Sequence, residues 1–213
     1  MYDIVSKKGT YDTYLFGIKE KLTYDELDDA YKYNLVFHNI PFAEKTYIED
    51  CEYECVKEIV SNEVFAKYYH LIFGSDKDIK YEDFHFYYSV YECINNGSKY
   101  YCKQNIGSDV NPTKQYIDYD RTEQNGDEIY VYVKSLDVYN SDDEYGGIYK
   151  DYFNNYKLDD ITFYENIVHD YYTYEEKKYF LFGKYGDDAK EYKVTFKKEN
   201  NSDNYYWYSV EAI

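Results

Sequence analysis

The 213-residue chain contains no run of about 18 apolar residues, so it predicts no membrane-spanning helix. Residues 1–4 do not form the basic and apolar start of a secretory signal peptide. A chain that begins after a removed leader would look the same, so export is not excluded. The start of the sequence is therefore compatible with an extracellular or cell-surface location and with a cytoplasmic one.

Motifs for catalysis or cofactor binding are also missing. The sequence has no G-x-S-x-G, P-loop or G-x-G-x-x-G pattern, and no Ser or Cys in a recognisable nucleophile setting. His38, His70, His85 and His169 lack the H-x-x-x-H or H-x-H spacing of metal ligands. We therefore predict no catalytic residue, cofactor or metal, and a non-enzymatic protein. An enzyme would need a carboxylate with His or Tyr in an apolar cleft, which the sequence does not locate.

Positive charge is scarce relative to negative charge. The 24 Lys and Arg, of which Arg121 is the one Arg, oppose 42 Asp and Glu, and the formal net charge is −18. Nucleic acids and anionic membranes are bound through cationic surface, so we predict that the chain binds neither directly. We interpret the acidic clusters at residues 25–29, 118–120, 142–144 and 187–188 as solvated faces. The loop at 140–147 comes nearest to a calcium loop, but it lacks that loop's glycine and final glutamate.

Tyrosine is the abundant residue, with 35 Tyr beside 12 Phe, one Trp and one Met. The core must therefore be built largely from aromatic rings, and each buried Tyr needs a hydrogen-bond partner for its hydroxyl. Some tyrosines must be exposed, and a contiguous exposed cluster can stack on sugar rings or form the centre of a protein interface. For any single Tyr, core filling is the default interpretation.

Residues 1–22 are expected to form a tail or an edge strand, and residues 23–74 are expected to be mainly helical. Thr23 and Glu26 have the spacing of a capping box, and apolar residues then recur every three or four positions, which predicts a helix over 24–38. A second apolar stripe runs up to Gly74, with Ser61 or Asn62 as its cap, and predicts a second helix. Residues 51–60 are interpreted as a further helical turn or two.

Residues 83–213 alternate aromatic and polar side chains and are expected to be mainly antiparallel strands. We place strands at 84–94, 99–104, 115–120, 128–138 and 149–154, a short helix at 174–183, and a hairpin at 192–213. We interpret the rings of this hairpin as core, so the binding site is expected elsewhere. This order predicts one α+β domain over 1–213, with N-terminal helices packed on a curved antiparallel sheet. The shape expected is cone-like, with an NTF2-like fold as the first comparison and the C-terminal β-hairpin at its end.

Four cysteines allow three disulfide pairings if they are oxidised. A two-residue loop of Gly97 and Ser98 sets Cys93 opposite Cys102, in a pair whose Cα separation of about 4.5–5.5 Å suits a disulfide. The alternative loop, shifted by one residue, sets Cys93 opposite Tyr100, and we prefer the first register. A disulfide between Cys51 and Cys55 is less expected, because it requires that their segment be a loop. Reduced thiols throughout and a four-thiolate zinc site are the remaining interpretations.

Three stretches resemble surface domains of unknown role in low-GC Gram-positive bacteria, which are often lipid-anchored. They are the final Tyr192-Lys-Val-Thr-Phe-Lys-Lys with Tyr205-Tyr-Trp-Tyr-Ser-Val-Glu, the strand at 129–138 followed by Tyr149-Lys-Asp-Tyr, and the helix end Leu71-Ile-Phe-Gly74. The resemblance covers roughly residues 60–213. It implies an extracytoplasmic domain and supplies no site residues.

These observations predict an extracytoplasmic domain that binds a protein, peptide or glycan through an aromatic surface, with its ligand-binding residues unknown. The alternative is a cytoplasmic acidic inhibitor or nucleic-acid mimic, of a kind that a phage could encode, whose carboxylates bind a basic protein surface. That alternative predicts reduced thiols and carboxylates on one side only. The scattered Lys residues, which interrupt every long acidic run, favour the first hypothesis.

Overall fold

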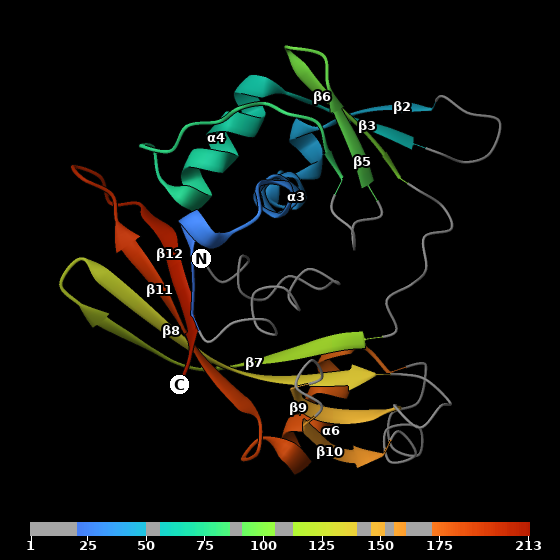
Figure 1. Ribbon diagram of the computed structural model, residues 1–213, viewed down its shortest axis with the longest axis vertical. Coiled ribbons are helices and arrows are strands. Elements are labelled where there is room, and N and C mark those ends of the chain that lie inside the picture. The colour runs from blue at the N-terminus through green and yellow to red at the C-terminus, as the bar shows by residue number, and fades with distance from the viewer. Residues whose placement is uncertain are drawn as a thin grey trace. The chain divides into compact units, whose positions relative to one another are not determined.

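The computed structural model (Figure 1) describes residues 21–49, 56–85, 91–104, 113–139, 146–151, 156–160 and 172–213. Over these residues the chain is an α+β protein with three α-helices and two antiparallel sheets. Its contacts divide it into two units. The first holds the described residues within Tyr24–Val110 and Lys197–Tyr208, and the second holds those within Ser6–Thr23, Asn111–Phe196 and Ser209–Ile213.

Two helices pack on a five-stranded sheet in the first unit. Helix α3 (Asp29–Asn39) contacts strand β4, and helix α4 (Asn62–Phe73) contacts both α3 and strand β3. The strand order is β2-β3-β6-β5-β4. The bounds are Thr46–Glu49 for β2, Val56–Ser61 for β3, Phe84–His85 for β4, Tyr91–Asn95 for β5 and Lys99–Gln104 for β6, with short 3-10 turns at Tyr24–Glu26 and Phe42–Glu44.

The boundaries of α4 confirm the sequence prediction, whereas those of α3 differ from it. The Ser61 side chain caps α4 by accepting a hydrogen bond from the Val64 amide at 3.2 Å, and Gly74 ends the helix with a φ of 101°. The first helix begins later than predicted, because Asp28 is its cap: Oδ1 accepts from the Ala30 amide at 2.8 Å. Thr23 lies in strand β1 (Lys21–Thr23), and Tyr24–Glu26 form a 3-10 turn ahead of α3, so the predicted helix start at residue 24 was wrong.

Two predicted elements before the disulfide hairpin need correction. The described part of the segment predicted as helical at 51–60 is strand β3, whose Val56, Ile59 and Val60 are β-branched residues that suit a sheet. The strand predicted at 84–94 is two strands, β4 and β5, of which β4 is only two residues long. Strand β5 pairs with β6 so that Cys93 lies opposite Cys102, which confirms the preferred register. The Asn96 amide donates to the Lys99 carbonyl at 3.1 Å and closes the loop.

The core of the first unit is built from aromatic rings, as the composition predicts. The Tyr69 hydroxyl lies 2.7 Å from that of Tyr24, and the Tyr100 hydroxyl donates to the Glu82 carbonyl at 3.2 Å, so buried hydroxyls find partners. Burial raises the pKa of Tyr33 to about 12 and also raises the pKa values of Tyr69 and Tyr100. The buried rings are Tyr31, Tyr33, Phe37, Phe65, Tyr69, Phe73, Phe84, Tyr100 and Trp207.

The second sheet has seven strands, in the order β1-β12-β11-β8-β9-β10, with β7 also paired to β8. Helix α6 (Tyr174–Tyr185) begins with a capping box between Thr173 and Glu176 and packs its buried Leu181 and Tyr185 into a core with Tyr116, Leu136 and Ile148. The strands span Thr113–Asn125 for β7, Glu128–Tyr139 for β8, Gly147–Asp151 for β9, Tyr156–Asp160 for β10, Lys190–Lys198 for β11 and Tyr205–Ala212 for β12. Strand β7 is longer than predicted at both ends, β9 begins two residues earlier, and β2 and β10 were not predicted.

A buried cation on α3 is held by a carboxylate one turn earlier. The Lys32 side chain is 7% exposed, and its Nζ lies 2.8 Å from Asp29 Oδ1 and 4.2 Å from the centre of the Tyr24 ring. Lys80 Nζ lies 3.6 Å from Asp29 Oδ2. The hydrogen bond from Lys32 holds the pKa of Asp29 below its ordinary value of 3.8.

We expect Asp29→Asn to lower the free energy of unfolding by about 1–2 kcal/mol at pH 7. The change leaves the buried ammonium of Lys32 without its counterion, and the effect is reduced because Asp29 is 44% exposed to screening solvent. Since the folded pKa of Asp29 is depressed, its stabilisation is present above pH 3.8 and is lost as the pH falls through the lower, folded value. The difference in free energy of unfolding between wild type and Asp29→Asn is measured by denaturant titration at neutral pH and at strongly acidic pH.

The matched control is Asp78→Asn, which removes an exposed carboxylate in the same unit and should leave stability almost unchanged. A difference between wild type and Asp29→Asn that persists in strong acid would contradict this assignment.

Candidate functional site

A disulfide joins Cys93 and Cys102, with a Cα separation of 4.1 Å. Both residues are no more than 1% exposed, so the bridge is a buried cross-link between β5 and β6. Cys51 and Cys55 lie outside the described residues. The cysteines that the structure describes therefore stabilise the first unit and offer no accessible thiol.

The histidines and acidic clusters that the structure describes are not brought together. His38 and His70 are half-buried and His85 is exposed, while His169 and the cluster at 142–144 lie outside the described residues. Among the residues that the structure describes, no three His, Cys, Asp or Glu side chains are grouped so as to hold a metal ion. Of these candidates, His70 alone lines the pocket described next.

A pocket of about 280 Å³ opens in the first unit beside the C-terminal end of α4. One wall comes from α4 and the residue after its cap, and the other from the turn between β11 and β12 and the start of β12. Ligand pockets commonly measure about 300–1,000 Å³, so this one suits a single ring-sized group. Its lining residues are Lys67, His70, Leu71, Ser75, Glu199, Asn204, Tyr205 and Tyr206.

Hydrogen bonds fix both walls of the pocket. The Ser75 amide donates to Glu199 Oε1 at 3.0 Å, which joins the end of α4 to the β11–β12 turn. The Glu199 amide in turn donates to the Asn204 carbonyl at 2.9 Å and closes that turn. His70 Nε2 lies 3.0 Å from the Lys77 carbonyl, which requires the imidazole to carry its proton on Nε2. The pocket is therefore largely preformed.

Gly74 allows the close approach of the two walls. Its φ of 101° is one that other residues rarely adopt, and a Cβ there would lie 2.9 Å from Asp76 Oδ1 and 3.4 Å from Tyr206 Cγ. The glycine that ends α4 thus also leaves room for the Tyr206 ring at the pocket.

The positive charge of Lys67 at the pocket is compensated. Lys67 Nζ lies 3.0 Å from both carboxylate oxygens of Glu44, and the Tyr68 hydroxyl donates to Glu44 Oε1 at 2.5 Å. These donors lower the pKa of Glu44, and the bond to Glu44 raises the pKa of Lys67. Glu199 is likewise held by the Ser75 amide. The pocket therefore offers two tyrosines, an imidazole, a carboxylate and a carboxamide without an unbalanced cation.

The sequence did not indicate this site. Tyr205 and Tyr206 were interpreted as core, whereas both are half-buried and line the pocket. His70, to which the sequence assigned no role, is half-buried and lines the pocket. Strand alternation places Tyr205 and Tyr206 on opposite faces, so nothing in the pattern indicates that both reach one cavity. The polar turn before them was the available signal, because loops carry many binding residues.

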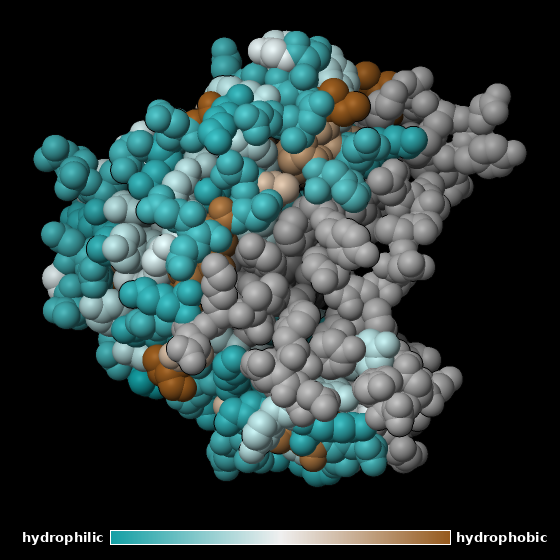
Figure 2. Space-filling view, in the orientation of Figure 1, coloured by the Kyte–Doolittle hydropathy of each residue, from teal (hydrophilic) through white to brown (hydrophobic). Residues whose placement is uncertain are grey.

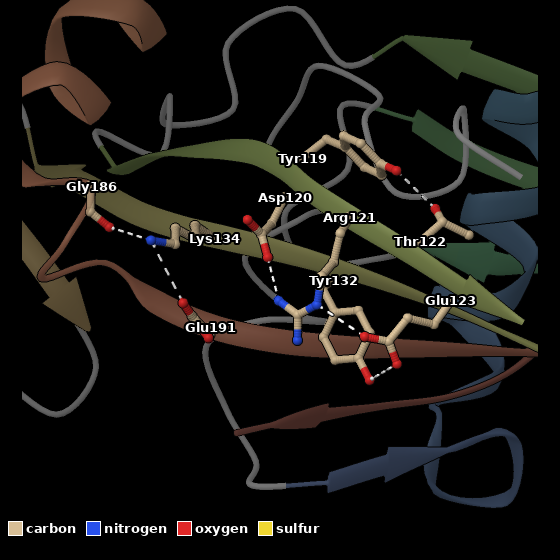
Figure 3. A network of polar contacts seen from close by, with 9 residues as sticks. All are labelled: Tyr119, Asp120, Arg121, Thr122, Glu123, Tyr132, Lys134, Gly186 and Glu191. Carbon is tan, nitrogen blue, oxygen red and sulfur yellow. Dashed lines mark hydrogen bonds and ion pairs between the residues drawn. The ribbon is translucent and has the colours of Figure 1, made fainter.

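A second polar network lies on β7 and β8 in the second unit (Figure 3). Arg121 lies 3.8 Å from the centre of the Tyr132 ring, its Nε donates to Glu123 Oε1 at 3.1 Å, and its Nη1 donates to Asp120. The Tyr132 hydroxyl donates to Glu123 Oε2 at 3.2 Å. Because these groups satisfy one another on an exposed surface, we interpret the network as a support for the hairpin rather than as a ligand site.

Among the coloured residues on the face shown in Figure 2, hydrophilic ones predominate and hydrophobic ones form small separate patches. No α-helix in the described part of the chain is long and apolar enough to cross a bilayer. No protein-family model, curated protein or solved structure matches the chain. The pocket at the end of α4 is therefore the candidate site that the geometry itself supports.

Proposed function

We propose that the chain is a non-enzymatic extracytoplasmic binding protein that takes one sugar unit of a glycan into the pocket of Tyr205 and Tyr206. The observation that carries the proposal is the composition of this pocket, in which two adjacent tyrosines share a small cavity with the polar side chains of Glu199, Asn204 and His70. A pyranose ring presents apolar C–H faces and a rim of hydroxyls. Aromatic rings contact the former, and carboxylate, carboxamide and imidazole groups bind the latter.

The compensated positive charge of Lys67 favours a neutral ligand over an anionic one. Lys67 is paired with Glu44, so a phosphate or carboxylate ligand would have to displace an ion pair. Glu199 accepts the Ser75 amide with one oxygen, which leaves its other oxygen available to a hydroxyl donor. A sugar uses this arrangement without burying an unpaired charge.

The disulfide supports the extracytoplasmic part of the proposal. Structural disulfides persist in oxidising environments and are rare in reducing cytosol. The competing hypothesis of a cytoplasmic acidic inhibitor predicts reduced thiols, which the Cys93–Cys102 bridge does not favour. Its predicted one-sided carboxylate stripe also fits poorly with acidic residues paired to lysines in both units, such as Asp29 with Lys32 and Asp159 with Lys184. The NTF2-like cone, the closing C-terminal hairpin and the single-domain organisation stay predictions.

Tyr206→Ala is expected to weaken sugar binding at least tenfold, which corresponds to about 1.4 kcal/mol, because it removes a ring from the pocket wall. Tyr206→Phe keeps the ring and should retain most of the affinity. The probes are glucose, galactose, mannose, N-acetylglucosamine and their β-linked dimers, screened on an array and then titrated by calorimetry.

Tyr179→Ala is the control outside the pocket, because Tyr179 is 75% exposed on α6 in the second unit. The Tyr179→Ala variant should bind the sugar with the same affinity as wild type. Sugars that bind Tyr206→Ala as well as wild type, or no sugar bound at all, would refute the proposal. Binding of a peptide that Tyr206→Ala abolishes would assign the pocket to a peptide side chain instead.

A further inference from the structure

Glu199 gives the pocket at the end of α4 a negative charge that no ion pair among the described residues balances. Its Oε1 accepts from the Ser75 amide at 3.0 Å, which is a neutral donor. Lys67, the other charged residue of the lining, is paired instead with Glu44 at 3.0 Å. The Glu199 side chain is only half-buried, so a ligand in the pocket can reach it.

The lysines that follow α4 and precede the β11–β12 turn have other contacts. Lys77 and Lys198 each pair with an aspartate of their own segment, at 3.3 Å and 3.2 Å. Lys197 Nζ lies over a tyrosine ring, 3.5 Å from its centre. None of these three lysines is the counterion of Glu199 in the structure, and a cationic group on a ligand would supply one.

The two tyrosines of the pocket suit the same kind of group. The face of an aromatic ring attracts an ammonium that lies within about 6 Å of its centre. The chain makes this contact among its own side chains, since Lys32 Nζ lies 4.2 Å from the centre of the Tyr24 ring. Tyr205 and Tyr206 line the pocket together with Glu199, so the pocket combines aromatic rings with a carboxylate.

The remaining polar groups favour a sugar amine over the amine of a lysine side chain. His70 donates its Nε2 proton to the Lys77 carbonyl at 3.0 Å, so Nδ1 of the neutral ring is an acceptor. Asn204 adds both an acceptor and donors. A lysine side chain carries its ammonium on an apolar chain and offers these two residues no hydroxyl. An amino sugar offers an ammonium and hydroxyls on one ring.

We propose that the sugar unit bound in the pocket carries a free amino group, as glucosamine does, and that its ammonium pairs with Glu199. This inference rests on the glycan-binding function proposed above and names the class of sugar. The net charge of −18 attracts a cationic glycan toward the protein. An N-acetylated unit lacks the positive charge and is the weaker ligand.

The test is calorimetric titration with glucosamine, N-acetylglucosamine and glucose at about pH 7, where an amine of this kind is mostly protonated. Glucosamine should bind about tenfold more tightly than either neutral sugar, as expected for a hydrogen bond between charged groups. Glu199→Gln keeps an oxygen for the Ser75 amide and removes the charge. It should lower the affinity for glucosamine to that for N-acetylglucosamine and leave the affinities for the neutral sugars close to those of wild type.

The matched control is Glu63→Gln, which removes an equal charge from an exposed position in the first turn of α4, away from the pocket. This variant should prefer glucosamine as strongly as wild type does. A preference for glucosamine that survives Glu199→Gln would overturn the inference. So would n-butylamine bound as tightly as glucosamine, which would assign the pocket to an aminoalkyl side chain.

Two further outcomes separate this inference from the proposed function. Neutral sugars that bind through Tyr206, with glucosamine bound no more tightly, would overturn the inference and leave the glycan-binding function standing. No sugar bound at all would refute both.

Discussion

Phe65→Ala is expected to lower the free energy of unfolding by about 3–5 kcal/mol, the largest effect of any single substitution considered for the first unit. The Phe65 side chain is fully buried on α4. Its ring centre lies 4.6 Å from that of Tyr100 on β6 and 5.7 Å from that of Tyr33 on α3. Removing the ring therefore opens a cavity where both helices meet the sheet, and the rigid rings around it cannot easily fill the space.

Trp207 provides the measurement. It is the one Trp of the chain, is 1% exposed, and lies in the first unit with its ring centre 6.2 Å from that of Phe73. Denaturant titration followed by its fluorescence should show an earlier midpoint for Phe65→Ala. Leu71→Ala, on the same helix but 50% exposed, should cost less than about 1 kcal/mol. Equal losses for the two variants would contradict the assignment of Phe65 to the core.

Removing the disulfide with Cys93→Ala and Cys102→Ala is expected to cost about 2.5–3 kcal/mol. The two residues are nine positions apart, and the chain-entropy relation gives this value for a closed loop of that size. Because both side chains are buried against the core, the alanines also lose packing, which adds to the loss. Unfolding of the double variant beside wild type, each with and without reductant, measures the effect.

Reductant should shift the unfolding midpoint of wild type toward that of the double variant and leave the double variant unchanged. Four free thiols in denatured wild-type protein without reductant would show that the bridge does not form, and this prediction would then fail.

Local pattern was sufficient for helix α4 and for the register of the hairpin that carries Cys93 and Cys102. Ser61 and Gly74 bracket an apolar stripe, and α4 begins and ends there. The two-residue loop at Gly97 and Ser98 fixed the register that sets Cys93 opposite Cys102. Where two signals competed, the pattern was misleading: Thr23 and Asp28 both suit a helix cap, and the structure uses Asp28. The run from Val56 to Val60 is too short for its periodicity to distinguish a strand from a helical turn.

The pocket could not be predicted because it depends on distant segments. Ser75 and Glu199 are brought together by the packing of both segments in one unit, and no short motif encodes their contact. The position of Tyr174 against the edge of β7 is similar, since Tyr174 and Ile117 are 57 residues apart. Sequence periodicity reports which face of an element is buried, but it does not report which other element covers that face.

The hydrogen bond between the Ser75 amide and Glu199 joins residues that are 124 positions apart. During synthesis, the wall that α4 supplies leaves the ribosome long before the turn that carries Glu199, Tyr205 and Tyr206. Closing so large a loop is slow compared with forming local helices and hairpins. The pocket therefore forms only after the chain as far as Tyr206 has been made, and ligand binding would distinguish molecules that have passed this point from shorter nascent ones.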